Sequence, residues 1–321
     1  MLAVRVHVDG GAQRLVLEEV ATPTPRPDQL LIRVSAFSVN RADLGSGTVG
    51  GGVPRDPFVP GVDVGGTVEA VGHAITQWNP GDPVIALVRG AYAEFALARP
   101  ATAYRPPAGM GIEDAASIPG VFFTAWYGLT VWGRLQPGET ALVHAAGSGV
   151  GSAGIQIARA LGARVLTSAG GDDRVSMGIA LGAEAGINYS TQDVSSELQR
   201  LTDGKGVDVV LDSVGGEVFE STLRALAPGG RVVTVGAAGG PRAELDDAAL
   251  RAKGQSVQAM SVGADAAEDR DQLGWAQLRE WFEDGTLRPV VDRVLPWSQA
   301  EAAHRLLQDR AVFGKVVLRV E

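Results

Sequence analysis

The sequence contains no cysteine among its 321 residues. This absence excludes a disulfide framework, a cysteine-ligated zinc, an iron–sulfur cluster and a thiol nucleophile. Lysine and arginine number only 28 against 37 acidic residues, and a net charge of −9 without a basic run argues against nucleic acid as a partner. The longest hydrophobic run, Val121 to Trp132, is too short to cross a bilayer. We therefore expect an acidic protein with no nucleic-acid and no membrane partner.

Residues 1–11 alternate like a strand and lack the apolar core of a signal peptide, which favours a cytoplasmic protein. The length suits two domains, and 45% hydrophobic residues are enough to form large cores. Glycine is abundant, at 43 of 321 residues, about 13% against a usual share of about 7%. Because glycine serves where the backbone turns tightly or is closely approached, some of these glycines are candidates for a ligand site.

Residues 1–100 show short alternating segments separated by proline-containing breaks, which predicts a β-rich barrel or sandwich. The expected strands are Leu2–Val8, Leu15–Val20, Leu30–Val39, Thr67–Val71, Val84–Val88 and Tyr92–Ala98. The pattern changes near residue 112. The glycine-dense stretch Gly45–Gly52 is expected to be a mobile loop.

From Thr140 onward, apolar and helix-period segments alternate at βαβ spacing, which predicts a doubly wound parallel sheet. The expected strands are Ala141–Val143, Ala163–Thr167, Ala185–Asn188, Val207–Leu211, Arg231–Val235 and Val257–Met260, and the expected helices are Val150–Leu161, Arg174–Leu181, Val194–Leu201 and Glu217–Leu226. Two helical segments, Gln272–Phe282 and Gln299–Asp309, and a strand, Lys315–Val320, follow; we expect this tail to pack on the first domain.

A glycine-rich turn between the first strand and first helix of this array predicts a dinucleotide site. Free backbone N–H groups and the positive end of a helix dipole favour a pyrophosphate there. The literal G-x-G-x-x-G match is Gly149 to Gly154, but its last glycine falls inside the helix. An earlier register, Ala145-x-x-Ser148-x-x-Gly151, places the turn directly after the strand, and we prefer it.

The end of the second strand decides between NAD and NADP. An NAD enzyme needs an acidic side chain there, and the segment Thr167 to Gly170 offers none. Asp172 and Asp173 follow closely and could reach back, whereas Arg174 suits a 2′-phosphate. The alternative is that these three residues are only the solvated first turn of a helix. We favour NADP(H).

Several stretches together resemble the zinc-independent medium-chain dehydrogenases/reductases of the quinone oxidoreductase type. They are Val39–Asp43, Pro60–Gly72, Gly81-Asp82, Gly90–Glu94, Thr124-Ala125, the turn at 145–151, Ile187–Tyr189, Asp212–Gly216 and Gly314–Leu318. The resemblance implies a GroES-like β-barrel domain of residues 1–120 and 263–321, a Rossmann α/β domain of residues 121–262 with NADPH in the cleft, and a homodimer.

The resemblance also implies site residues. It makes Asn40 and Thr124 the catalytic positions beside the nicotinamide, where they could hold its carboxamide or ribose. It places Ser148, Gly149 and Val150 at the pyrophosphate, Gly170, Arg174, Tyr189 and Arg310 around the 2′-phosphate, and Ser213, Gly236 and Ala237 near the ribose and nicotinamide. We expect Tyr92 and Asp63 to be packing or turn residues and Asp43 to fix its own loop.

No metal site is expected. The ligands of zinc-dependent relatives are missing, and the four histidines, 7, 73, 144 and 304, lack metal-ligand spacing and are expected at the surface or at strand ends. The resemblance implies hydride transfer from NADPH to a small-molecule quinone or activated alkene. The loop after Asp43 departs from the family pattern and offers no obvious acid, so we expect solvent to be the proton source. The alternative is an NADPH-binding sensor or crystallin-like protein with little turnover.

Overall fold

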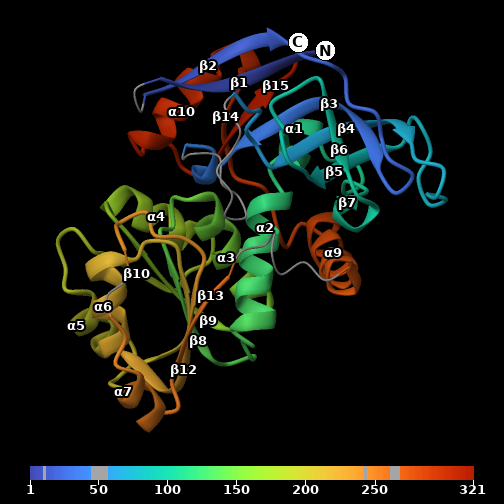
Figure 1. Cartoon of the computed structure of the whole chain (residues 1–321). Helices are drawn as coiled ribbons and strands as arrows, with labels where there is room; N and C mark the ends of the chain where they lie inside the picture. The colour runs from blue at the N-terminus through green and yellow to red at the C-terminus, as the bar shows by residue number, and fades with distance from the viewer. Residues whose placement is uncertain (10–11, 45–56, 242–243, 261–267) are drawn as a thin grey trace. The chain divides into compact units, whose positions relative to one another are not determined.

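The structure is a computed structural model that describes residues 1–9, 12–44, 57–241, 244–260 and 268–321. The chain divides into two compact units (Figure 1). Unit 1 comprises Met1–Val121 and Ala266–Glu321, and unit 2 comprises Phe122–Asp265. The expected loop at Gly45–Gly52 lies outside the described residues.

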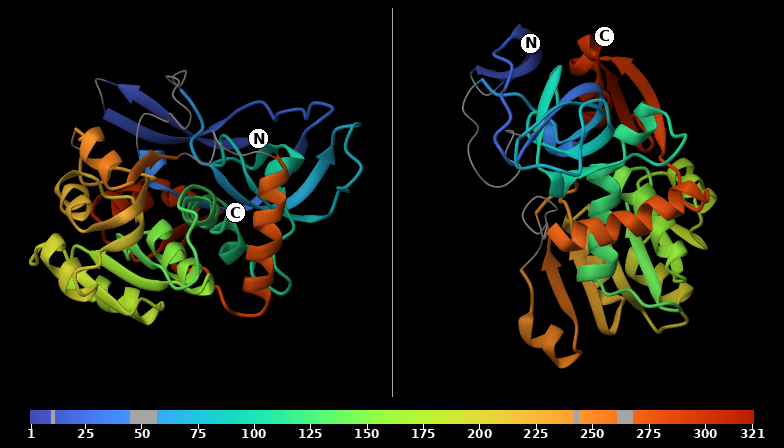
Figure 2. Two further views of the ribbon diagram at one scale, coloured as in Figure 1. Left: turned by 90° about the horizontal axis from the view of Figure 1, so that it is seen from below. Right: turned by 90° about the vertical axis from the view of Figure 1, so that its right-hand side faces the viewer.

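Unit 1 is built mainly of antiparallel strands. Among the described residues, β1 (Leu2–Asp9) and β2 (Ala12–Glu19) form a two-stranded hairpin, drawn in blue in Figure 2. A larger sheet has the order β14-β15-β3-β4-β5-β7, with β6 also paired to β3. Its strands are β3 (Leu30–Val39), β4 (Asp63–Val71), β5 (Pro83–Leu87), β6 (Phe95–Ala98), β7 (Ala103–Tyr104), β14 (Val291–Pro296) and β15 (Lys315–Arg319).

The C-terminal segment completes unit 1. Helix α1 (Ile112–Ala116) packs on β3 and β4, α9 (Glu268–Glu283) is the long orange-red helix of Figure 2, and α10 (Ala300–Gln308) follows β14. Strand β15 runs antiparallel to β3, so the last residues of the chain close onto an early strand. Trp297, Ala303 and Leu307 bury their side chains in the core formed by the strands.

Unit 2 contains a parallel sheet of the predicted kind. In the described part of the chain its order is β10-β9-β8-β11-β12-β13, the order of a dinucleotide-binding doubly wound sheet. The strands are β8 (Thr140–His144), β9 (Arg164–Ala169), β10 (Ala185–Asn188), β11 (Val207–Asp212), β12 (Leu226–Thr234) and β13 (Ser256–Ala259). The helices are α2 (Pro119–Trp126, which begins in unit 1), α3 (Gly149–Ala160), α4 (Asp172–Ala180), α5 (Val194–Leu201), α6 (Gly216–Arg224) and α7 (Asp247–Ala252).

Helices cover both faces of this sheet, because its strands are apolar on both sides. Leu142 lies in a cluster with Leu198 of α5 and Phe219 of α6. Its neighbour Val143 points the other way, toward α3, where a Cβ on Gly154 would lie only 3.1 Å from the valine. Glycine at 154 therefore lets α3 pack closely on the sheet.

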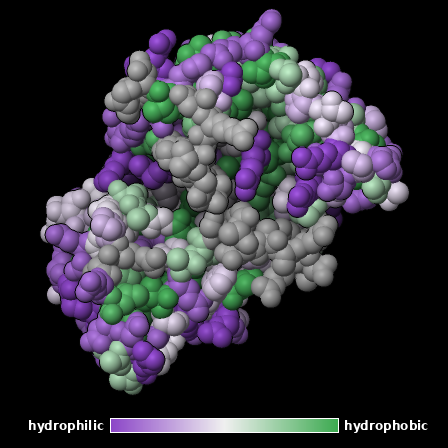
Figure 3. Space-filling model, in the orientation of Figure 1, coloured by the Kyte–Doolittle hydropathy of each residue, from purple (hydrophilic) through white to green (hydrophobic). Residues whose placement is uncertain are grey.

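The described part of the chain exposes few large hydrophobic side chains. Hydrophilic residues make up much of the face drawn in Figure 3, with smaller hydrophobic areas between them. Within the described ranges, the large hydrophobic side chains that remain exposed are Val8, Leu17, Met177, Ile179 and Val294. No helix in those ranges is both long and apolar enough to cross a membrane.

Candidate functional site

The turn after β8 has the geometry of a phosphate-binding turn. Strand β8 ends at His144, and Ser148 caps α3 by accepting a hydrogen bond from the Gly151 N–H at 2.9 Å. A Cβ on Gly151 would lie 2.0 Å from the Ala145 carbonyl oxygen, so only glycine fits there. The earlier register therefore matches the observed turn. The N–H groups of Gly149 and Val150 have no hydrogen-bond partner among the described residues, and they stand at the positive end of a 12-residue helix.

Two residues predicted around a 2′-phosphate lie beside this turn. Arg174, in the first turn of α4, packs its side chain over the turn, since a Cβ on Gly147 would lie 2.8 Å from Arg174 Cδ. Tyr189, just after β10, packs over Gly170, whose added Cβ would lie 3.1 Å from the tyrosine ring. Strands β10, β9 and β8 are neighbours in the sheet, so their carboxyl ends bring these residues together.

The acidic residues that could have favoured NAD are placed differently. Asp172 accepts a hydrogen bond from Asn188 Nδ2 at 2.7 Å, which ties its carboxylate to the end of β10. Asp173 is exposed in the first turn of α4. Of the three polar residues that begin α4, Arg174 is the one that lies against the glycine turn.

The later predicted residues form a second group at the same edge of the sheet. Ser213 follows β11, and a Cβ on Gly236 would lie 3.3 Å from its carbonyl oxygen. Ala237 is the next residue along and is exposed. Thr124 lies half-buried in α2. The structure thus groups Ser213 with Gly236, as adjacent parallel strands require.

Asn40 belongs to a buried polar network of unit 1. Its Oδ1 accepts a hydrogen bond from Lys315 Nζ at 2.6 Å, and its Nδ2 donates to Asp63 Oδ2 at 2.8 Å. Asp63 Oδ2 also accepts from Ser38 Oγ at 2.6 Å, and Lys315 Nζ also donates to the Val39 carbonyl at 2.9 Å. Lys315 and Asp63 are 4% and 0% exposed, with 3.6 Å between Nζ and Oδ2. Burial lowers the pKa of Lys315, against the effect of the nearby carboxylates.

The network continues through Asp43. Its Oδ2 accepts from the Asn40 N–H at 2.7 Å and from the Tyr92 hydroxyl at 3.3 Å. The same hydroxyl lies 3.1 Å from His304 Nε2. Burial raises the pKa of the Asp43 carboxyl to about 7 and lowers the pKa of His304 to about 4. The core of unit 1 therefore holds a carboxyl that takes up a proton near neutral pH.

Arg310 lies at the exposed C-terminal end of α10, with a positive φ of 54°. Its N–H and Arg41 Nη2 both donate to the Leu307 carbonyl, at 3.2 and 3.1 Å. The charge of Arg310 also contributes to lowering the pKa of Arg41, after burial. Two guanidinium-bearing residues are thus close together, and the sequence had singled out only Arg310.

Sequence reasoning missed most of this network. The expectation for histidines is wrong at His304, which is buried in α10. Asp63 and Tyr92 are more than packing or turn residues, since each hydrogen bonds within the network. Asp43 holds its own loop through the Asn40 N–H, as expected, and also accepts from the Tyr92 hydroxyl. A signal existed: the stretches that carry the resemblance, Val39–Asp43, Pro60–Gly72, Gly90–Glu94 and Gly314–Leu318, each contribute at least one of the polar residues. No group of three or more acidic or histidine side chains in the described ranges is arranged to hold a metal.

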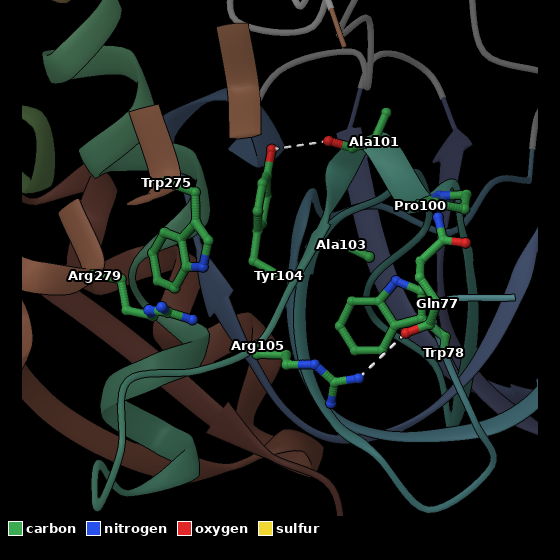
Figure 4. Close-up of a pocket in the computed structure, with 9 residues that line it drawn as sticks. All are labelled: Gln77, Trp78, Pro100, Ala101, Ala103, Tyr104, Arg105, Trp275 and Arg279. Carbon is green, nitrogen blue, oxygen red and sulfur yellow. Dashed lines mark hydrogen bonds between the residues drawn. The ribbon is translucent and has the colours of Figure 1, made fainter. Parts of the chain in front are cut away.

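A separate cavity of about 300 Å³ lies in unit 1 (Figure 4). The rings of Tyr104 and Trp275, 5.4 Å apart, stand on one side, and Trp78 stands on the other with the Arg105 guanidinium 4.7 Å over its ring. Arg105 is also paired with Asp82 at 2.9 Å. None of the predicted site residues lines this cavity.

Comparison with known proteins agrees with this architecture. Residues 26–120 match the model of the alcohol dehydrogenase GroES-like domain, and residues 181–318 match that of a zinc-binding dehydrogenase domain. The quinone oxidoreductase of Sus scrofa is 35% identical over 99% of this chain and 97% of its own length. The 2-haloacrylate reductase of a Burkholderia species is 30% identical over 99% of this chain and 98% of its own. A mycobacterial structure complexed with NADPH is 32% identical and superposes with a TM-score of 0.90, covering 99% of this chain and 100% of that one.

A GroES-like unit together with a doubly wound parallel sheet defines a medium-chain dehydrogenase fold. The similarity to quinone oxidoreductases, which extends over nearly the whole chain, identifies the family within this fold. The chain belongs to the quinone oxidoreductase family of the medium-chain dehydrogenases/reductases, and it is an oxidoreductase.

Proposed function

We propose that this protein is an NADPH-dependent reductase that transfers hydride to a small quinone or activated alkene without zinc. The observation that carries the proposal is the β8–α3 turn with two unpartnered N–H groups among the described residues and with Arg174 packed over it. A pyrophosphate fits the N–H groups, and a 2′-phosphate fits the guanidinium. The NADPH complex of the mycobacterial relative supports the same cofactor.

The residues have distinct roles in this proposal. Ser148, Gly149 and Val150 bind the pyrophosphate, and Gly170, Arg174, Tyr189 and Arg310 surround the 2′-phosphate. Asn40 and Thr124 orient the nicotinamide, with Ser213, Gly236 and Ala237 near it and its ribose. Bound NADPH supplies the hydride, and the protein contributes binding, orientation and exclusion of water. Unit 2 is the cofactor domain and unit 1 the catalytic domain.

The proposed hydride acceptor follows from a chemical feature common to the substrates that the relatives' names give. Quinones and 2-haloacrylates both hold an electron-poor carbon conjugated to a carbonyl group. Hydride addition to such a carbon needs no metal when the product oxygen or carbon takes its proton from water. The chain has no cysteine to ligate a catalytic zinc as the zinc-dependent enzymes do, which supports catalysis by positioning.

The cofactor assignment is tested by fluorescence titration with NADPH and NADH. Arg174→Ala is expected to weaken NADPH binding by about 10- to 100-fold, the value of a charged hydrogen bond, and to leave NADH nearly unchanged. Arg200→Ala is the matched control, since Arg200 lies on α5 of the same unit in an exposed pair with Glu197. Equal losses for both cofactors would refute the role of Arg174.

The reaction is tested by the loss of NADPH absorbance at about 340 nm with a panel of quinones, enones and haloacrylates. Turnover above background with one of these compound classes identifies the class of hydride acceptor. Tight NADPH binding with no turnover would overturn the reductase and favour a sensor or a crystallin-like protein. The proposed homodimer is tested by sedimentation: a monomer at working concentrations contradicts it.

A further inference from the structure

We propose that Lys315 is a positioning residue that holds the Asn40 side chain so that the amide is left only as a hydrogen-bond acceptor for the nicotinamide riboside. The inference rests on the proposed function, which places Asn40 beside the nicotinamide. The inference adds a role for Lys315, which lies 275 positions from Asn40 in the sequence, and it specifies that Asn40 accepts the hydrogen bond from the cofactor.

Lys315 and Asp63 fix the orientation of the Asn40 side-chain amide, that is, the positions of its Oδ1 and Nδ2 atoms. Lys315 Nζ donates to Oδ1 at 2.6 Å, and Asp63 Oδ2 accepts from Nδ2 at 2.8 Å. Turning the amide over would place its NH₂ against the lysine and its oxygen against the carboxylate. Both contacts would then be repulsive, so one orientation is strongly preferred.

The orientation determines what Asn40 has left to offer. An amide NH₂ has two hydrogens, and here one goes to Asp63 while the other is directed at the Ser38 carbonyl oxygen, 3.4 Å away. An amide oxygen has two lone pairs, and Lys315 takes one. The remaining capacity of half-buried Asn40 is one lone pair on Oδ1. It suits a donor, such as the carboxamide NH₂ or a ribose hydroxyl, and does not suit the carboxamide oxygen.

The fold brings these groups together at some energetic cost. Strands β15, β3 and β4 are adjacent, and Lys315, Asn40 and Asp63 stand at neighbouring strand ends. A Cβ on Gly120 would lie 2.6 Å from Asp63 Oδ1, so a glycine is needed to accommodate the carboxylate. Asp63 Oδ1 has no hydrogen-bond partner in the described part of the chain. A buried ion pair with an unsatisfied oxygen is a poor device for stability, which points to orientation of the amide as its use.

The test separates positioning from folding with a pair of variants. Lys315→Met removes the donor but leaves the Asp63 carboxylate without its cation, so a loss of fold is a risk. Adding Asp63→Asn to it removes both charges at nearly constant volume, and we expect this double variant to fold. Arg319→Met is the matched control, because Arg319 lies on the same strand in an exposed pair with Glu113 and does not contact the network.

The first measurement is binding, with NADPH and with its reduced 3-acetylpyridine analogue, in which a methyl group replaces the amide NH₂. The double variant is expected to bind NADPH about five- to tenfold more weakly than the wild type, the value of one oriented hydrogen bond. If the carboxamide NH₂ is the donor, the analogue loses nothing further in the variant. If a ribose hydroxyl is the donor, NADPH and the analogue are weakened alike. Arg319→Met should bind both as the wild type does.

The second measurement asks whether Lys315 acts through Asn40. In an Asn40→Ala background, Lys315→Met with Asp63→Asn should cause no further loss of NADPH affinity. Wild-type affinity in the folded double variant, or an equal loss with and without Asn40, would overturn the proposal. NADPH binding without turnover by the wild type would overturn the proposed reaction while these binding arms still decide the role of Lys315. No NADPH binding by the wild type would refute both.

Discussion

Replacing Asp43 by asparagine should remove a pH dependence from the stability of the protein. The carboxyl is 2% exposed, and burial raises its pKa from 3.8 to about 7. The unfolded chain releases this proton near pH 4, whereas the folded chain keeps it until about pH 7. The stability that Asp43 contributes is therefore fully present below pH 4 and is lost as the pH rises through 7.

The magnitude follows from the two pKa values. Asp43 should lower the free energy of unfolding by about 2 kcal/mol between about pH 5.5 and pH 8.5, and by about 4 kcal/mol in all. His304 works in the opposite direction: its pKa is lowered to about 4 by burial, so its contribution rises with pH between about 4 and 6.5. Both proteins contain His304, so its contribution cancels when the free energy of unfolding of Asp43→Asn is subtracted from that of the wild type at each pH. Asparagine keeps an oxygen for the Asn40 N–H and the Tyr92 hydroxyl.

The assay is urea unfolding at about pH 5.5, 7 and 8.5, followed by tryptophan fluorescence. Trp78 and Trp297 are buried in unit 1 and report its unfolding. Asp82→Asn is the matched control, since its hydrogen bond to Arg105 lowers the pKa of Asp82 and keeps it ionised across this range. A difference between the wild type and Asp43→Asn that stays constant with pH would refute the reasoning, because it would mean that Asp43 is ionised in the folded protein.

Two further predictions concern stability, and urea unfolding checks both. Ala145 has a φ of 57°, which strains a residue with a Cβ, so Ala145→Gly should raise the free energy of unfolding by about 1 kcal/mol. Gly151→Ala sets a Cβ 2.0 Å from the Ala145 carbonyl oxygen and should lower the free energy of unfolding by more than about 2 kcal/mol. Destabilisation by the first variant and stabilisation by the second would contradict the observed turn. Glu139→Gln breaks a bidentate, partly buried ion pair with Arg231, at 2.9 and 2.7 Å, and should lower the free energy of unfolding by about 1 kcal/mol. Glu69→Gln breaks the exposed pair with Arg33 and should change it by less than about 0.5 kcal/mol. Similar losses in the two variants would show that partial burial does not strengthen the Glu139–Arg231 pair.

The fold could be predicted from local patterns. Strand β3 and helix α5 coincide with the expected Leu30–Val39 and Val194–Leu201, because their apolar periodicity is regular and their ends are marked by turn residues. Elements with a weaker pattern were missed. Strand β14, Val291–Pro296, alternates little, and its exposed residues make it resemble a loop. The expected strand at Tyr92–Ala98 is shorter, since β6 begins at Phe95.

The unit 2 part of the candidate site was also within reach of the sequence. Gly147, Ser148 and Gly151 follow a strand and precede a helix, and the carboxyl ends of parallel strands meet at one edge of their sheet. Gly170 and Tyr189 follow the next two strands, so local elements and one topological rule place them together. The structure shows why glycine is needed at 151, since a Cβ there would lie 2.0 Å from the Ala145 carbonyl oxygen.

The sequence by itself determined the two-unit architecture, the glycine turn and the exclusion of cysteine chemistry, because these depend on composition and on contacts between near neighbours in the chain. Only the tertiary structure decided that Asn40, Asp63 and Lys315 form one network, with Asp43 and His304 linked to it. These residues come from distant segments that strand pairing joins. Their protonation and hydrogen-bond direction depend on burial and on partners, neither of which a local pattern encodes.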